Sequence, residues 1–90
     1  MVTMFVRHTV QDYDAWRAVY DEFESEHPKF GVRGEAVYQT VDNPSEVTVT
    51  HDFDDVESAR AFVESDDVRT AMDKAGVTGE PEIWFASERE

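Results

Sequence analysis

The chain has 90 residues, 40% of them hydrophobic, and carries 21 acidic against 8 basic side chains, which gives a formal net charge of −13. This length allows a single domain, residues 1–90, and the apolar content separates the chain from disordered proteins. The negative charge argues against binding of nucleic acid or an anionic membrane, and the lack of cysteine excludes disulfides and thiolate chemistry.

The acidic residues are spread along the whole chain, and Lys29 and Lys74 are its only lysines. Such a surface repels itself in dilute buffer, and salt screens this repulsion over about 10 Å at 0.1 M. The composition is typical of proteins from halophilic microbes, with an ordinary acidic protein as the alternative. The N-terminus lacks a signal-peptide pattern, and no apolar run has the length of a membrane span. We therefore expect a cytoplasmic protein.

The first half of the chain predicts a strand followed by a helix. Residues 2–10, "VTMFVRHTV", alternate in polarity and place Met4, Val6, His8 and Val10 on one face, which indicates a strand. Asp12 or Asp14 can cap the helix that follows, and the segment "HPKFG" ends it. The apolar stripe of this helix recurs at three and four residues and consists of Tyr13, Trp16, Tyr20, Phe23 and His27.

The second half predicts a hairpin, a broken helix and a last strand. Residues 33–41 and 46–53 indicate two strands joined by the turn "DNPSE". A second helix begins at Asp54 or Asp55, is interrupted by "ESDD" and ends at Gly76, and the last strand centres on "IWF". The order βαββαβ predicts an α+β, ferredoxin-like fold: a four-stranded antiparallel sheet with the helices on one face.

The two halves share a sequence pattern around a histidine. "VRHTVQDYDAW", residues 6–16, aligns without a gap on "VTHDFDDVESA", residues 49–59, and this pairs His8 with His51 and Asp12 with Asp55. We expect the first and third strands to be the central pair of the sheet and to run parallel. Both histidines would then lie side by side on the apolar face beneath the helices.

This expected site favours proton transfer, because two adjacent imidazoles in a poorly solvated place cannot both be charged. His8 and His51 are therefore the candidate catalytic residues, and Tyr13, Trp16, Tyr20 and Phe62 are candidate ligand-binding walls. In the alternative interpretation each histidine satisfies a backbone carbonyl and the aromatic rings fill the core. A metal site that includes His27 is disfavoured, because the chain has no His-x-His spacing.

The opposite face of the predicted sheet mixes polar and apolar side chains. By alternation it carries Phe5, Arg7, Thr9, Thr48, Thr50 and Asp52, with Val37, Val41 and Trp84 in or near it. A mixed face of this kind suits a second copy of the chain, so we expect a homodimer that packs sheet against sheet. We also expect Arg7 to form a salt bridge with Asp52 beneath the partner, and Arg33 to lie at the solvated rim.

The segments "RHTVQDYDAWRAVYDEF", "HDFDDVESARAF", "SDDVRTAMDKAGV" and "PEIWF" together resemble the dimeric α+β barrel superfamily over nearly the whole chain. The chain is most similar to the small cyclase-like proteins related to antibiotic biosynthesis monooxygenases. This resemblance implies a pocket between sheet and helices for a small hydrophobic, often polycyclic, molecule. It also implies cofactor-free oxygenation, in which a substrate anion reacts directly with oxygen and His8 or His51 acts as the base.

The same resemblance argues against a cofactor. Haem-degrading members of the superfamily have a tryptophan and an axial histidine on the second helix, where this chain has Phe62 and Ala71. A non-catalytic ligand-binding or stress-associated barrel remains the main alternative. An RNA-binding ferredoxin-like domain is disfavoured, because the central strands lack both a basic surface and an aromatic-rich motif.

Overall fold

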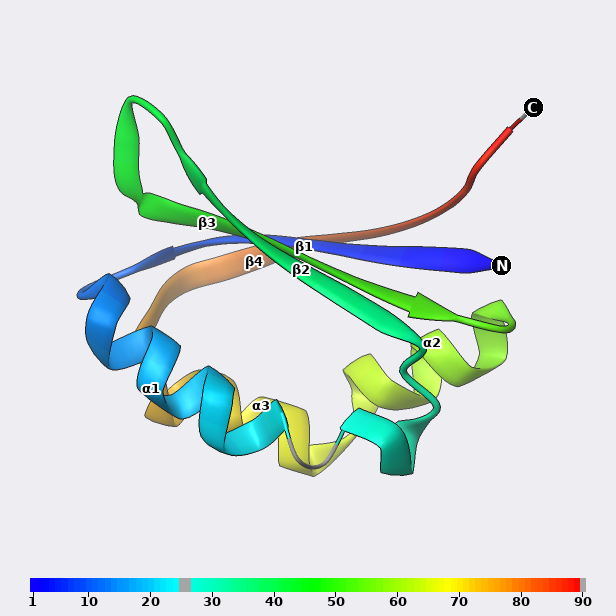
Figure 1. Cartoon of the computed structure of the whole chain (residues 1–90). Coiled ribbons are helices and arrows are strands. Elements are labelled where there is room, and N and C mark those ends of the chain that lie inside the picture. The colour runs from blue at the N-terminus through cyan, green and yellow to red at the C-terminus, as the bar shows by residue number, and fades with distance from the viewer. Residues whose placement is uncertain (25–26, 90) are drawn as a thin grey trace.

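A computed structural model describes residues 1–24 and 27–89, with side chains described from residue 29 onwards after the gap (Figure 1). The fold is the predicted ferredoxin-like α+β arrangement. Its elements are β1 (Val2–Val10), α1 (Tyr13–Glu24), the 3-10 helix η1 (His27–Phe30), β2 (Gly34–Thr40), β3 (Asn43–Phe53), α2 (Val56–Glu64), α3 (Asp66–Lys74) and β4 (Val77–Ser87). No helix in these ranges is long and apolar enough to cross a membrane.

The four strands form one sheet in the order β2-β3-β1-β4, and all helices cover the same side of it (Figure 1). β1 and β3 are the central neighbours, as predicted, but they run antiparallel, with Val6 opposite Val49 and His8 opposite Val47. The predicted parallel pairing is wrong. Helix α1 returns the chain so that β2 runs in the direction of β1, and the hairpin then reverses β3.

The antiparallel pairing separates the two histidines. Both lie on the helix-covered face, as predicted, but they extend in opposite directions from the central pair Val6 and Val49. His51 lies four residues along β3 from the partner of His8, which corresponds to roughly 14 Å at a rise of about 3.4 Å per residue. The expectation that His8 and His51 lie side by side is therefore wrong.

The repeated sequence pattern corresponds to a local two-fold relationship between the two central strands. Each repeat forms a strand, a buried histidine and an aspartate that caps the next helix. The Asp12 carboxylate accepts a hydrogen bond from the Ala15 amide at 3.2 Å, and Asp55 accepts one from the Ser58 amide at 2.8 Å. The shared spacing of histidine and aspartate therefore reflects one strand-to-helix geometry used twice.

Ser65 divides the second helical region into α2 and α3. Its hydroxyl accepts a hydrogen bond from the Val68 amide at 3.2 Å and donates one to the Phe62 carbonyl at 2.9 Å. One side chain thus ends the first helix and caps the second, which explains the interruption predicted at "ESDD". As a result α3 turns back beside α1, and the two helices cover the β1 and β3 ends that carry His8 and Val47 (Figure 1).

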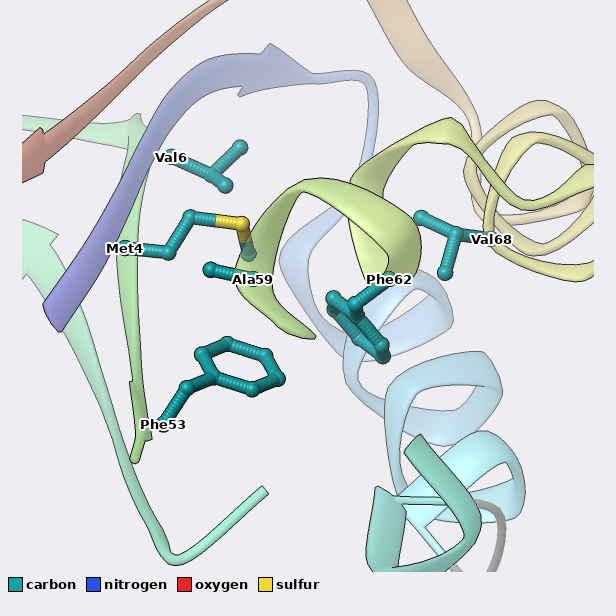
Figure 2. Packing of buried hydrophobic residues seen from close by; sticks show 6 residues of the cluster. All are labelled: Met4, Val6, Phe53, Ala59, Phe62 and Val68. Atoms are coloured by element: carbon teal, nitrogen blue, oxygen red, sulfur yellow. The ribbon is translucent and has the colours of Figure 1, made fainter. Parts of the chain in front are cut away.

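The core lies between the sheet and the helices. Figure 2 shows Phe53 of β3 and Met4 of β1 facing Ala59 and Phe62 of α2. The buried apolar side chains of both layers are Met4, Val6, Val10, Trp16, Val47, Val49, Phe53, Ala59, Phe62, Val68 and Ala75. Val37 was expected on the other face, but it pairs with Val49 and packs against this core, because the β2 register fixes its side.

The outer face of the sheet is mixed, as predicted, but its ion pairs differ from the expected ones. Arg7 pairs with Glu46, and the Asp52 carboxylate accepts a hydrogen bond from the Thr3 hydroxyl at 2.7 Å. The antiparallel register explains this difference, since it places Asp52 opposite Thr3 instead of Arg7. At the exposed rim, Arg33 forms a salt bridge with Asp54 at 2.8 Å.

Candidate ligand-binding site

A cavity of about 60 Å³ lies between the sheet and the three helices. Its walls are formed by apolar and aromatic side chains of β1, β3, α1, α2 and α3, and its polar lining side chains are His8, Tyr20 and His51. The two histidines therefore belong to one cavity even though they are not neighbours. We take this cavity as the candidate site, because an apolar pocket with a few polar groups is the usual form of a small-molecule site.

His8 is a buried titratable group of the cavity. Its side chain is 6% exposed, and neither ring nitrogen has a hydrogen-bond partner in the part of the chain that the structure describes. Burial in these apolar surroundings lowers the pKa of His8 to about 4. The imidazole is therefore neutral at pH 7, with a nitrogen lone pair available to a molecule in the cavity.

An irregularity in β4 lies next to His8. The pairing of β1 with β4 shifts between Arg7, which faces Glu82, and Thr9, which faces Thr78. The chain around Gly79 thus bulges away, with Gly79 at a φ of 69°, a left-handed conformation that glycine adopts without strain. Bulges of this kind commonly occur beside functional sites, where they locally end the regular strand pairing.

His51 has a more polar environment than His8. It is 5% exposed and lies directly opposite Glu35 of β2 in the sheet register. The ring of Tyr20 lies 6.2 Å from the His51 ring, and burial, followed by interaction with the Glu35 carboxylate, raises the pKa of the Tyr20 phenol. Tyr20 and His51 therefore form the more polar end of the cavity, with Glu35 beside them outside its lining, and His8 lies at the apolar end.

Two aromatic rings of α1 connect these ends. Trp16 and Tyr20 stack at 5.0 Å between ring centroids, and the Trp16 ring lies 5.6 Å from His8. Of the four predicted wall residues, Trp16, Tyr20 and Phe62 line the cavity. The fourth, Tyr13, packs behind Trp16 at 5.8 Å and does not line it.

Several lining residues were not predicted. Val19 and Met72 follow the apolar stripes of α1 and α3, so their helical spacing could have identified them. Glu35, which interacts with Tyr20 but does not line the cavity, has no such signal, because only the antiparallel register places it opposite His51. Among the described residues no group of three or more histidine or acidic side chains could hold a metal ion. The His27 side chain, part of the predicted helical stripe, lies outside the described residues.

The fold was compared with known proteins. No protein-family model and no curated protein matches the chain. Solved structures do match. A candidate antibiotic biosynthesis monooxygenase from Bordetella bronchiseptica superimposes with a TM-score of 0.84 at 15% identity, over 99% of this chain and 97% of the other. A conserved protein from Methanosarcina mazei Go1 gives 0.79 at 18% identity, covering 98% and 92%.

A third match is SnoaB, a cofactor-independent oxygenase from Streptomyces nogalater, with a TM-score of 0.81 at 15% identity, over 99% of this chain and 93% of SnoaB. The chain has the fold of the antibiotic biosynthesis monooxygenases. The expected resemblance is therefore confirmed for the fold. At identities of this size the likeness concerns the backbone arrangement, and the cavity must be interpreted from its own residues.

The lowered pKa of His8 predicts a specific effect of pH on stability. Between pH 4 and the ordinary value of 6.5, the unfolded chain binds a proton at His8 that the folded chain does not. The His8 contribution to the free energy of unfolding therefore rises with pH across this window, by at most about 1.4 kcal/mol per pH unit, and is constant above it.

Urea unfolding of wild type and His8→Leu from pH 4.5 to 7.5, at one protein concentration, measures this contribution, because the carboxylates common to both proteins cancel in the difference. We expect wild type to lose stability relative to the variant as the pH falls below 6.5. Parallel curves for the two proteins would contradict the assignment of a neutral, desolvated imidazole.

Proposed function

We propose that the chain binds a small apolar molecule in the cavity between sheet and helices and oxygenates it, or cyclises it, without a cofactor. The observation that carries this proposal is the buried, neutral His8 imidazole, whose two nitrogens lack hydrogen-bond partners among the described residues. A polar group left unsatisfied in this way costs about 1–3 kcal/mol of stability. A ligand that donates a hydrogen bond to His8 would remove that cost.

The chemistry follows from the environment of His8. The imidazole takes a proton from an acidic C–H or O–H group of the ligand, and the ligand becomes an anion. The imidazolium and the anion remain in contact, and their attraction offsets the desolvation that otherwise disfavours a charged His8. The anion then reacts with O₂. Where a methylene becomes a carbonyl, one oxygen atom stays on the ligand and the other leaves as water with the two hydrogens removed.

The small volume of the cavity favours a second candidate function, a ligand-binding barrel that performs no chemistry. A cavity of 150 Å³ is known to bind benzene, and this one measures about 60 Å³. A ring-sized ligand must therefore displace lining side chains, of which Met72 is the most adaptable. A protein that only stores or carries such a ligand would need a cavity that opens in this way and no catalytic group.

Oxygen uptake with a panel of anthrones and naphthols separates the two functions. For the monooxygenase we expect His8→Gln to lower kcat by about 100-fold, with a much smaller change in KM, because general-base catalysis contributes about 10²- to 10⁴-fold. Tyr13→Phe, which alters a ring outside the cavity, is the matched control. Binding of these compounds without oxygen uptake would favour the non-catalytic function, and equal turnover by wild type and His8→Gln would exclude His8 as the base.

We further propose that the protein is a homodimer formed through the outer face of the sheet. On this face Phe5 of β1 and Trp84 of β4 stack in parallel at 5.2 Å. Trp84 remains 42% exposed and Tyr38 of β2 58% exposed, so both edge strands present an exposed aromatic side chain. Exposed aromatic surface of this kind is typical of protein interfaces.

Sedimentation of Trp84→Asp tests the proposed interface. We expect the wild type to sediment as a dimer and this variant to weaken dimerisation by at least about tenfold, because it buries a charge against the partner. Ala61→Asp introduces the same charge at an exposed position of α2, on the helix side, and should leave the dimer intact. A monomeric wild type, or equal effects of the two substitutions, would exclude this interface.

We also propose adaptation to high salt, supported by the net charge of −13. At about 1 M salt the screening length falls to about 3 Å, so repulsion between surface carboxylates is strongly reduced. We expect the thermal unfolding midpoint to rise steadily between about 0.1 and 2 M KCl. A midpoint that is independent of KCl would indicate an ordinary acidic protein.

A further inference from the structure

A groove of about 450 Å³ crosses the outer surface of the helix layer between α1 and α3. Its volume lies within the range of about 300–1,000 Å³ that is usual for small-molecule sites, unlike that of the cavity beneath it. Its walls come from α1, from Lys29 in η1 and from α3. The groove is therefore large enough to hold most of a small ligand.

The groove and the cavity share a wall. Val19 and Phe23 of α1 and Ala71 of α3 line both spaces, so a single layer of side chains separates them. The two spaces would join only if this shared layer, which includes the Phe23 ring, moved aside. A ligand that lies in the groove can then insert its apolar end towards Trp16 and His8, which line the cavity.

The charges of the groove differ from those of the rest of the molecule. Both lysines of the chain, Lys29 and Lys74, line it. The acidic lining residues are Glu22 and Asp67, and Glu22 pairs with Lys74 at 3.4 Å between exposed side chains. The formal charges of these four residues sum to zero on a chain of net charge −13. An anion in the groove therefore meets less repulsion than the net charge of the chain would suggest.

These charges can accommodate the single charge of a carboxylate. A ligand carboxylate can replace Glu22 as the partner of Lys74 and also interact with Lys29. The exposed pair of Lys74 with Glu22 that is lost contributes only about 0–1 kcal/mol to stability. The groove and the apolar cavity beneath it thus favour a carboxylate head and an apolar body.

We propose that the groove between α1 and α3 binds the carboxylate of a ring-containing monocarboxylic acid through Lys29 and Lys74, with the apolar end of the acid directed into the cavity. This inference rests on the proposed function, because it specifies the class of molecule that reaches His8. It assigns the only two lysines of the chain a role in substrate recognition.

Binding of 2-naphthoate and of its neutral analogue 2-naphthamide tests the proposal. The readout is quenching of Trp16 fluorescence in a Trp84→Phe background, which leaves Trp16 as the only tryptophan. We expect naphthoate to bind about tenfold more tightly than naphthamide at low salt. The double substitution Lys29→Gln and Lys74→Gln should abolish this preference, whereas Arg69→Gln, which removes an exposed cation of α3 outside the groove, should preserve it.

The outcomes distinguish this inference from the function on which it rests. Equal binding of the two probes, or a naphthoate preference that survives the double lysine substitution, would overturn the carboxylate site and leave ligand binding in the cavity intact. Failure of both probes to quench Trp16 would contradict the cavity as a binding site and the carboxylate site with it. Circular dichroism of each variant confirms that a lost preference does not result from unfolding.

Discussion

The antiparallel pairing of β1 with β3 determines which side chains meet beneath the helices. It places Val6 opposite Val49 at the centre of the inner face and directs the two histidine-bearing ends of the strands away from each other. Each strand then continues into a helix capped by an aspartate, so the helices cross the sheet from opposite ends. The cavity lies where these two strand-and-helix units meet, and both contribute side chains to its lining.

The two units are similar in sequence but differ in environment. Beside His51, the register of β2 places Glu35, and the interaction of Glu35 with Tyr20 extends the polar character of this end. Beside His8, β4 bulges and α1 contributes the Trp16 ring. Desolvation keeps the His8 imidazole neutral. Its ring nitrogens have no hydrogen-bond partner among the described residues, and this lowers the stability of the fold. A buried group kept at such a cost is a candidate for function, because a structural role would be served equally well by an apolar side chain.

Much of the fold could be predicted from the sequence, because local signals determine it. Polarity alternation identified the strands and the buried face that carries Met4 and Val6, and of the two predicted caps of α1, Asp12 and Asp14, Asp12 is the one that accepts a hydrogen bond from the first turn. The direction of β3 relative to β1 depends on how α1 and the hairpin reverse the chain. Local patterns do not contain that information. The predictions that His8 lies beside His51 and that Arg7 pairs with Asp52 were wrong for this reason. Glu35 and the pair of lysines become neighbours of the site only after folding, so no spacing rule could have identified them.

A neutral His8 imidazole in an apolar cavity is the central feature of the candidate site. Long-range ¹H–¹⁵N correlation spectra of the three histidine side chains, recorded from pH 4 to 8 and assigned with His8→Gln, measure its protonation directly. We predict that the His8 ring nitrogens keep the shifts of a neutral imidazole down to about pH 5 and that protonation begins only below that value. A His8 ring that titrates near its ordinary pKa of about 6.5 would contradict the account.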